Sequence, residues 1–353
     1  MGLTTAASLS RHEHFAILPT MESLPPIALD VRRRDKARRD APSPFTREQV
    51  VAAFRAIYPD CGAVSDVAPV PQAFGNDVWL VDAVSGQFAL RVAPGPEDLA
   101  VVANAVEAQR LVSAAGVRTP HVLAYDDGSA LGRPLLVQEW LPGEDGETAW
   151  TALGAPERDR FARDFGRALA RVHAIPGPCF SDDVRLTEVL PDWPAGLRSY
   201  VERYAVRLRD AMLLPRATLD AAIARLQAGI AVLSPAIRPA LTHWDVWLAN
   251  TLLSAGRFAG LLDWDSAAFS DPLVDFVKLE VWVFERHPET ERPFLESYWS
   301  AAPRPPDAEQ RLDLYRGLEY LTHTYFFADW GERHVAAAFR ARLERWLEGG
   351  PAA

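Results

Sequence analysis

Apolar positions in the first half of the chain change their spacing several times, which predicts short strands around a helix. The segment FTREQVVAAFRAIYP carries apolar residues at helical spacing behind Thr46, a preferred N-cap residue, so we expect order to begin there. The segment VSDVAPVPQAFGNDVWLVDAVSGQFALRVAP then predicts three strands, with the turn VSGQ joining the last two. A helix over DLAVVANAVEAQRLVSAAG and two strands, in HVLAYDDG and RPLLVQEWLPG, complete a β-rich half.

From Thr148 onward the apolar residues follow helical spacing almost throughout. One predicted helix face is formed by Phe161, Phe165, Leu169 and Val172. The pattern therefore predicts an α+β chain, with a small β-rich domain over residues 42–140 and a larger helical domain over residues 141–349. We expect the joint between them within residues 138–143.

Residues 1–41 show no such pattern. The segment IALDVRRRDKARRDAPSP is a run of charges closed by prolines, with no hydrophobic period. We interpret residues 1–41 as a disordered tail or as an extension upstream of the true start, because Met21 offers a second start. A basic segment that docks on RNA or a membrane is the less favoured alternative.

Composition narrows the class of protein. Of 353 residues, 49% are hydrophobic and 24% are charged, as in ordinary globular chains, and the net charge of −10 argues against a general nucleic-acid binder. Cys61 and Cys179 form no C-x-x-C motif or disulfide framework, which favours a reducing cytoplasm. No apolar run approaches the length of a membrane span, and the N-terminus does not have the order of a signal peptide. We therefore expect a cytoplasmic monomer or homodimer without nucleic-acid or membrane partners.

The stretch LTHWDVWLANTLLSAGRFAGLLDWD places four polar residues in apolar surroundings: His243, Asp245, Asn250 and Asp263. An apolar interior accepts such groups only when each is paired. The runs NTLLS and FAGLLDW predict a small hairpin, which would bring Asn250 and Asp263 to one point, with Asp245 on the loop before them. Two carboxylates and an amide oxygen suit Mg²⁺, whereas no zinc-binding pattern is present. A buried polar network without catalysis is the alternative.

This arrangement is typical of phosphoryl transfer. Protein kinases share the spacing between an Asp and an Asn, followed by a metal-binding Asp. Further motifs stand in order along the chain: AFGNDVWLVD, FALRVA, VEAQRLVSAAGVRTPHVLAYD, LLVQEWLPG, GRALARVHAI, HWDVWLAN, LLDWD and DPLVDF. Together they resemble the aminoglycoside phosphotransferase family, small-molecule kinases with a protein-kinase-like bilobal fold. The resemblance extends from about Thr46 to Glu348.

The resemblance implies roles for the helical half. Asp245 would be the catalytic carboxylate, and Asn250 and Asp263 would hold Mg²⁺. His243 would be a structural residue of the loop rather than a general base. Of the acidic pair Asp271 and Asp275, Asp275 is expected to brace the catalytic loop.

The resemblance also implies nucleotide-binding residues in the β-rich half, for ATP or GTP as donor. Arg91 would contact the phosphates and Glu107 would pair with Arg91. Gly75 and Asn76 belong to the loop PQAFGND, which would cover the phosphates. Backbone groups of the hinge residues Gln138 and Trp140 would contact the base.

Several features leave the acceptor open. Trp244 replaces the small glycine common in this family, Trp247 fills a variable position, and Asp265 is either a second metal-facing carboxylate or solvent-exposed. Residues 265–348 hold sixteen acidic and ten basic residues, which favours a cationic acceptor. Three interpretations remain: a kinase of aminoglycoside-like compounds, a metabolic kinase of a small alcohol, amino alcohol or sugar, and a catalytically silent nucleotide-binding module.

Overall fold

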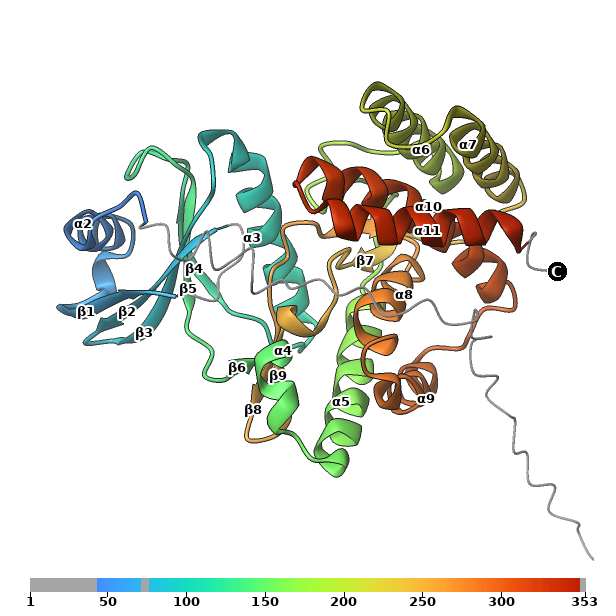
Figure 1. Cartoon of the computed structure of the whole chain (residues 1–353). Coiled ribbons are helices and arrows are strands. Elements are labelled where there is room, and N and C mark those ends of the chain that lie inside the picture. Colours follow the sequence, from blue (N-terminus) through green and yellow to red (C-terminus); the bar gives the residue numbers. More distant parts are fainter. Residues whose placement is uncertain (1–42, 71–75, 350–353) are drawn as a thin grey trace, which may run out of the picture.

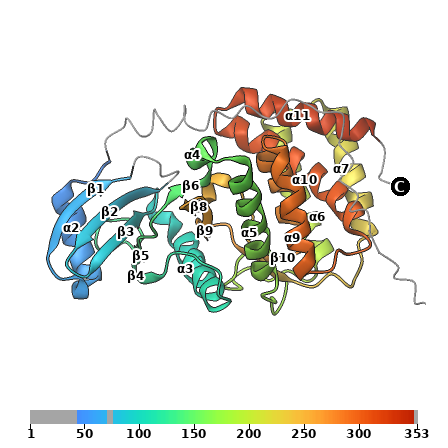
Figure 2. The same cartoon turned by 90° about the horizontal axis from the view of Figure 1, so that it is seen from below.

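The computed structural model describes residues 43–70 and 76–349 and has two lobes (Figures 1 and 2). A β-sheet with two helices forms the smaller N-terminal lobe, and helices dominate the larger C-terminal lobe. The bilobal α+β fold expected from the sequence is confirmed. The predictions for residues 1–41 and for Gly75 lie outside the described residues.

The N-terminal lobe is built around a five-stranded antiparallel sheet with the order β1-β2-β3-β5-β4. Its strands are β1 (Val64–Pro69), β2 (Asp77–Ala83), β3 (Gly86–Val92), β4 (Val122–Asp126) and β5 (Leu135–Glu139). Its helices are α2 (Arg47–Ile57) and α3 (Leu99–Ala114). The expected hairpin turn between β2 and β3 is present, because β2 ends at Ala83 and β3 begins at Gly86.

Helix α2 begins where the sequence predicts. The Thr46 side chain accepts a hydrogen bond from the backbone N–H of Gln49, and the Gln49 side chain accepts one from the Thr46 backbone, which is a reciprocal capping box. The buried face of α2 places Val50 and Phe54 against the sheet, where they share one core with alternate residues of β3 such as Leu90. This core is separate from that of the C-terminal lobe.

The described part of the C-terminal lobe contains helices and two small sheets. The helices are α4 (Gly146–Ala149), α5 (Ala155–His173), α6 (Trp193–Asp210), α7 (Arg216–Ala231), α8 (Val274–Leu279), α9 (Glu291–Ala301), α10 (Ala308–Asp329) and α11 (Arg333–Glu348). The strands are β6 (Glu144–Asp145), β7 (Ala240–Thr242), β8 (Thr251–Ser254), β9 (Arg257–Leu261) and β10 (Ala268–Ser270). The strand β7 pairs with β10, and β8 pairs with both β6 and β9.

The face predicted for α5 is buried: Phe161, Phe165, Leu169 and Val172 are each at most 1% exposed. They belong to a large core that also takes in Ala105, Ala108 and Val112 of helix α3. Helix α3 therefore connects the two lobes. It lies between β3 and β4 in the sequence of the N-terminal lobe, and its buried face packs into the core of the C-terminal lobe.

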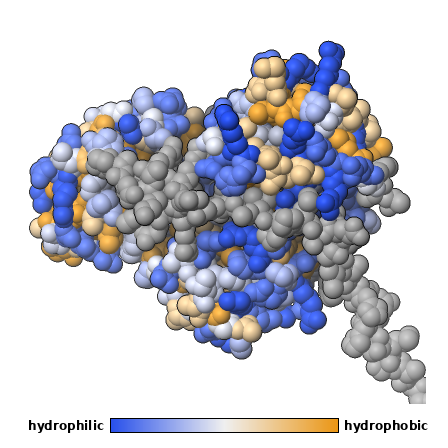
Figure 3. All heavy atoms as spheres, in the orientation of Figure 1, coloured by the Kyte–Doolittle hydropathy of each residue, from blue (hydrophilic) through white to orange (hydrophobic). Residues whose placement is uncertain are grey.

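The surface shown in Figure 3 is mostly hydrophilic, with apolar residues in scattered groups. Within the described part of the chain, no helix is both long enough and apolar enough to pass through a bilayer.

Candidate active site

The loop between β7 and β8 is held by one buried carboxylate from α8. The carboxylate of Asp275 accepts hydrogen bonds from the backbone N–H groups of His243, at 2.8 Å, and Trp244, at 2.7 Å. It also contacts Nε2 of His173 at 3.0 Å, and Nδ1 of His173 lies 2.7 Å from the Tyr298 hydroxyl. Asp275 is fully buried, so these donors offset the cost of removing its charge from water. The bend of the loop is thereby fixed.

His243 connects this loop to the end of the β8–β9 hairpin. Its Nε2 donates to the backbone oxygen of Leu262 at 2.9 Å, and its Nδ1 accepts from the backbone N–H of Asp245 at 3.3 Å. Burial lowers the pKa of His243, even though Asp275 and Asp245 oppose this shift, and the imidazole is neutral. Both nitrogens are engaged, so the ring links two segments and has no free position for taking up a substrate proton.

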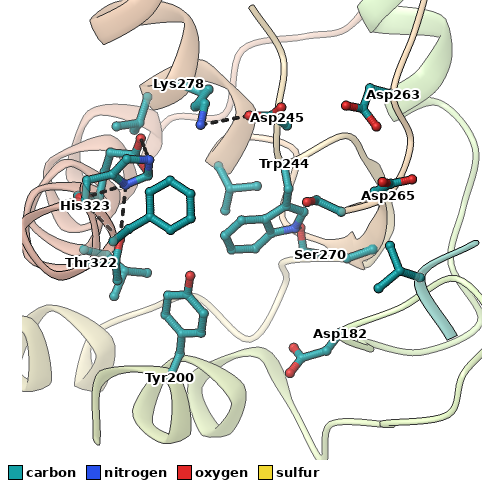
Figure 4. A pocket seen from close by; sticks show the side chains of 18 of the residues that line it. Asp182, Tyr200, Trp244, Asp245, Asp263, Asp265, Ser270, Lys278, Thr322 and His323 are labelled. Carbon is teal, nitrogen blue, oxygen red and sulfur yellow. Dashed lines mark hydrogen bonds and ion pairs between the residues drawn. The ribbon is translucent and has the colours of Figure 1, made fainter. Parts of the chain in front are cut away.

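The carboxylate of Asp245 is held from both sides. Its Oδ2 accepts a hydrogen bond from Nδ2 of Asn250 at 2.8 Å. Its Oδ1 forms an ion pair with Nζ of Lys278 on α8 (Figure 4), at 2.9 Å. Burial by itself raises the pKa of Asp245, but attraction and hydrogen bonding to Lys278, together with His243 and Asn250, outweigh it, so the pKa lies below its usual value. Asp245 is therefore ionised and its orientation is fixed.

The predicted hairpin is present as β8 and β9, with Asn250 directly before β8 and Asp263 two residues after β9. Asp263 adopts a left-handed backbone with φ of +61°, which is uncommon for a residue other than glycine. Its Oδ1 lies 3.2 Å from Nη2 of Arg91, and the same nitrogen contacts Asp265. Burial, followed by repulsion from Asp265 and Asp245, raises the pKa of Asp263 to about 7 although Arg91 opposes the change.

Arg91 reaches this point from strand β3 of the other lobe and is 8% exposed. Burial opposes its charge, but attraction to Asp265 and Asp263 raises its pKa. The side-chain oxygen of Asn76 accepts hydrogen bonds from its Nη2 at 2.7 Å and its Nε at 3.0 Å. Arg91, Asn76 and the two carboxylates thus form a charged cluster between the lobes.

The expected pairing of Arg91 with Glu107 is wrong for this structure. Glu107 forms its ion pair with Arg110, one turn further along α3, and the Glu107 side chain is 34% exposed. The α3 residue that faces the site is Asn104, whose Nδ2 donates to the backbone oxygens of Asp265, at 3.2 Å, and Ala267, at 2.8 Å. Glu107 lies about one turn beyond Asn104 on α3, and its carboxylate is engaged by Arg110 instead of Arg91.

The hinge prediction is corrected at Gln138. This residue lies inside β5, with β3 on one side and β4 on the other, so its backbone faces no open edge. Its side chain donates to Gln109 on α3. The backbone N–H of Trp140, just beyond the strand, donates to the oxygen of Gln87 at 3.2 Å. The N–H of Trp140 is therefore already engaged within the chain, as is that of Glu139, which donates to the oxygen of His121 at 2.9 Å.

A cavity of about 660 Å³ lies between the lobes and next to the loop between β7 and β8. Its lining includes five of the polar residues already described: Asn76, Asp245, Asn250, Asp263 and Asp265. Its far end is lined largely by aromatic residues of the C-terminal lobe (Figure 4). The described lining leaves out Arg91, Glu107, Gln138 and Trp140, so the cavity extends from the carboxylates into the C-terminal lobe rather than to the hinge.

The sequence profile described as the phosphotransferase enzyme family matches residues 66–315, which is most of the chain. The chain belongs to this family. It is therefore a small-molecule phosphotransferase, and the enzyme class expected from the sequence is confirmed. Comparison with curated proteins gives no match.

Solved structures agree on the fold of this phosphotransferase. A thermostable mutant of aminoglycoside phosphotransferase APH(4)-Ia, in a ternary complex with ADP and hygromycin B, superposes with a TM-score of 0.67 at 16% identity; the match covers 84% of this chain and 97% of that one. The gentamicin–APH(2″)-IIa complex gives a TM-score of 0.65 at 16% identity, over 87% and 99% of the two chains. At such identities the likeness establishes the protein-kinase-like fold and leaves the substrate of this phosphotransferase open.

The site of the phosphotransferase suits a magnesium ion. Across residues 43–70 and 76–349, no group of three or more His, Cys, Asp and Glu side chains is arranged to hold a metal by itself. Mg²⁺ needs no such group, since it takes one or two protein oxygens and completes its shell with water and phosphate. Moreover, Oδ1 of Asp265 is buried without a hydrogen-bond partner among the described residues. Asp263 is repelled by the neighbouring carboxylates of Asp265 and Asp245, although Arg91 pairs with Asp263 and Asp265 and Lys278 pairs with Asp245. A divalent ion would relieve this repulsion.

Two contacts of the phosphotransferase site were missed by the sequence reasoning. Lys278 lies thirty-three positions beyond Asp245, and the spacing of the motif does not indicate their contact. The buried role of Asn104 was only weakly indicated by the sequence, in which it is a lone amide within the apolar helical segment VVANAV. A polar residue in such a position calls for a buried partner, as the two backbone oxygens now show.

Trp244 occupies its crowded position at a conformational cost. Its φ of +63° lies in the left-handed region, where glycine is least strained. Its indole N–H donates to Oγ of Ser270 at 3.2 Å, and its ring centroid lies 6.1 Å from that of Tyr200. The indole therefore forms part of the cavity wall.

Proposed function

We propose that this phosphotransferase is a kinase that transfers the γ-phosphoryl group of ATP or GTP, with Mg²⁺, to a hydroxyl of a small molecule. The observation that carries this proposal is the ionised Asp245, fixed from both sides at a cavity shared with Asn250, Asp263 and Asp265. Phosphoryl transfer depends on positioning and charge stabilisation, and these groups supply both.

Asp245 would orient the acceptor hydroxyl. The oxygen atoms of its carboxylate accept hydrogen bonds from Asn250 and Lys278, and each retains a lone pair for the hydroxyl hydrogen. A strong base is not required, because the hydroxyl proton is lost late in a loose transition state. Lys278 would hold the carboxylate in place and offset its repulsion of the incoming phosphoryl oxygens.

Asn250 and Asp263 would hold Mg²⁺, whose chemistry is to bridge and neutralise phosphate oxygens. Arg91 would contact the phosphates as a permanent cation, with Asn76 fixing the direction of its guanidinium. The neighbouring structures hold ADP in one case and GDP in another, so both donors stay open for this chain.

Two questions about the function can be answered separately: whether the protein is an active kinase or a catalytically silent module, and whether an active kinase serves resistance or metabolism. The gathering of Asp245, Asn250 and Asp263 favours an active site over a silent one. A kinase of aminoglycoside-like compounds would confer resistance when expressed, whereas a metabolic kinase would not. We further propose a cytoplasmic setting, since Cys61 and Cys179 are both free.

The deciding experiment is nucleotide consumption by the full chain across a panel of hydroxyl-bearing compounds, with ATP and GTP in parallel and with Mg²⁺ or EDTA. We expect acceptor-dependent, Mg²⁺-dependent turnover and a phosphorylated product detected by mass spectrometry. Turnover that persists in EDTA, or a product phosphorylated on nitrogen, would contradict the proposal.

A further inference from the structure

The described lining of the cavity is rich in carboxyl groups and holds Lys278 as its one Lys or Arg. Its acidic residues are Asp98, Asp182, Asp245, Asp263, Asp265 and Glu319. Five of them have a partner within the chain: the backbone N–H of Gly95 for Asp98, Arg203 at 3.8 Å for Asp182, Asn250 and Lys278 for Asp245, and Arg91 for Asp263 and Asp265. Glu319, on α10, differs from these five.

The carboxyl group of Glu319 meets no hydrogen-bond donor among the described residues. Its Oε1 is buried without a hydrogen-bond partner, and it lies 3.2 Å from Nε2 of His323, one turn further along α10. Nδ1 of His323 lies 3.1 Å from the backbone oxygen of Glu319, which can only accept, so Nδ1 carries the hydrogen. Burial, with the charge of Lys278, lowers the pKa of His323 well below its usual value, so Nε2 of the neutral ring holds only a lone pair.

The other groups that face Glu319 also favour a protonated carboxyl. They are Lys278 on α8, Asp245 in the loop between β7 and β8, and Tyr200 on α6. Burial raises the pKa of Glu319 to about 7; Lys278 opposes this shift and Asp245 adds to it. Lys278 lies 2.9 Å from Asp245, so two carboxyl groups compete for one cation. A proton on Glu319 therefore takes the place of a second cation.

Aromatic rings surround the same part of the cavity, its aromatic end. The ring centroid of His323 lies 5.8 Å from that of Phe326 and 5.5 Å from that of Phe327, and Trp282 lies 5.9 Å from Nζ of Lys278. Figure 4 shows His323, Lys278 and Tyr200 at this end. Ring faces attract organic cations, and a carboxylate beside them supplies the opposite charge. A neutral hydroxyl brings no charge to replace the proton.

We propose that Glu319 is a specificity-determining residue of the acceptor site, which carries a proton in the free protein and loses it when the ammonium group of an alcohol acceptor binds beside it. This inference rests on the proposed kinase function. The carboxylic acid becomes a carboxylate and its proton passes to solvent, while the ammonium group keeps its own protons and becomes the counter-ion. Another part of the same molecule presents the hydroxyl to Asp245, which stays paired with Lys278.

The exchange of a proton for an ammonium group gives acceptor binding a defined pH dependence. Only the ionised form of Glu319 pairs with the ligand, so the affinity for an amine rises as the pH rises through about 7. Well below this pH each binding event releases close to one proton. Well above it Glu319 is already ionised, and almost no proton is released.

Two matched pairs of alcohols test the inference without relying on turnover. N-Methylglucamine and sorbitol differ in one amine, as do ethanolamine and ethylene glycol, and both amines stay largely protonated across the pH range used. Calorimetry on the full chain with Mg²⁺–AMP-PNP, at about pH 8, is expected to show an amine binding about tenfold more tightly than its neutral partner. If neither amine bound more tightly than its neutral partner, absence of binding included, the proposal would be overturned.

Calorimetry in phosphate and in Tris, which differ in their enthalpies of protonation, counts the protons released. We expect close to one at about pH 6 and almost none at about pH 8.5. No release at the lower pH would contradict the assignment of the proton to Glu319.

Variants locate both effects. Glu319→Gln, whose amide resembles the neutral acid, should keep the melting temperature at low pH and lose both the preference for the amine and the proton release. Glu319→Asp keeps a titrating carboxyl, so it should retain proton release with weaker affinity. Glu202→Gln, at an exposed position of α6 outside the described lining, is the matched control. An amine preference that survives Glu319→Gln would overturn the proposal.

Turnover measured separately keeps the two proposals distinguishable. Amine preference with proton release, but no phosphorylation of any alcohol, would contradict the kinase function and leave the role of Glu319 in ligand binding standing. Phosphorylation of the neutral alcohols in preference to their amine partners would retain the kinase and overturn the role of Glu319.

Discussion

The two ends of the cavity differ in how they are built. The end proposed to bind phosphate is a compact cluster of charges, with Arg91 facing Asp263 and Asp265. The end proposed to bind the acceptor is a wall of rings around Tyr200, with charged groups at Lys278, Glu319 and Asp182. Charges define the first by direction and pairing, whereas the second is defined by rings and by the carboxyl group of Glu319. One cavity can therefore keep a fixed chemistry at one end while its ligand specificity changes at the other.

The largest effect is expected where the two ends meet. Asp245→Asn keeps the side-chain shape but removes the negative charge that pairs with Lys278 and that we propose orients the acceptor hydroxyl. We expect a loss of at least about a hundredfold in kcat, because positioning contributes several kcal/mol to such reactions. The KM for the nucleotide should change far less. Steady-state kinetics decide this, and a variant with nearly normal kcat would place the catalytic carboxylate elsewhere.

The next effect tests the charged end alone. Asp263→Ala removes a proposed metal ligand and a partner of Arg91, so Mg²⁺-dependent nucleotide affinity should fall by about tenfold or more. Calorimetry with and without Mg²⁺ measures this, and Asp60→Ala, at an exposed position outside the cavity, is the control. Unchanged Mg²⁺–nucleotide affinity in Asp263→Ala would contradict the metal assignment.

Lys278 connects the two ends, and its removal is expected to have an intermediate effect. Lys278→Met leaves Asp245 without its cation, and we expect kcat to fall by about tenfold, while Lys278→Arg retains more activity. Circular dichroism checks that the fold is kept. If Met and Arg at this position behaved alike, the charge of Lys278 would have no part in turnover.

A pH effect on stability is expected at the acceptor end. Burial raises the pKa of Glu319 from 4.5 to about 7, although Lys278 opposes the shift, and Asp245 adds to it; His323 and Tyr200 also face this group. A raised pKa means that folding favours the protonated form. The stabilisation is therefore complete below about 4.5 and is lost as the pH rises through about 7.

Melting curves of the wild type and of Glu319→Gln across this pH range measure the effect. The wild type should lose melting temperature with rising pH relative to the variant, which cannot ionise. Parallel curves for the two proteins would show that Glu319 does not couple to folding.

The smallest effect concerns the corrected ion pair. Glu107 and Arg110 form a surface pair on α3, worth about 0–1 kcal/mol, so Glu107→Ala should change nucleotide affinity by less than about fivefold. Asn104→Ala should cost more stability, because it leaves the backbone oxygens of Asp265 and Ala267 without a donor. Thermal unfolding and nucleotide titration of both variants provide the comparison, and a larger affinity loss in Glu107→Ala would restore the expected pairing with Arg91.

Local patterns in the sequence were sufficient to predict much of the fold. The capping signal at Thr46, the turn between β2 and β3, and the apolar face of α5 are all present where predicted. These features depend on hydrogen bonds and spacing within a few residues, which a single sequence displays directly. The hairpin of β8 and β9 is likewise local, and it brings Asn250 near Asp263.

The sequence by itself therefore determined the lobes, the family and the short motif around Asp245. Only the tertiary structure decided which distant groups meet: Arg91 with Asp263 and Asp265, Lys278 with Asp245, and Asn104 in place of Glu107. The direction of a side chain depends on the rotation of its helix and on how the lobes dock, and neither is encoded in residue type or spacing. The aromatic end is the extreme case, because α6, the catalytic loop and α10 each contribute rings that have no common pattern until packing brings them together.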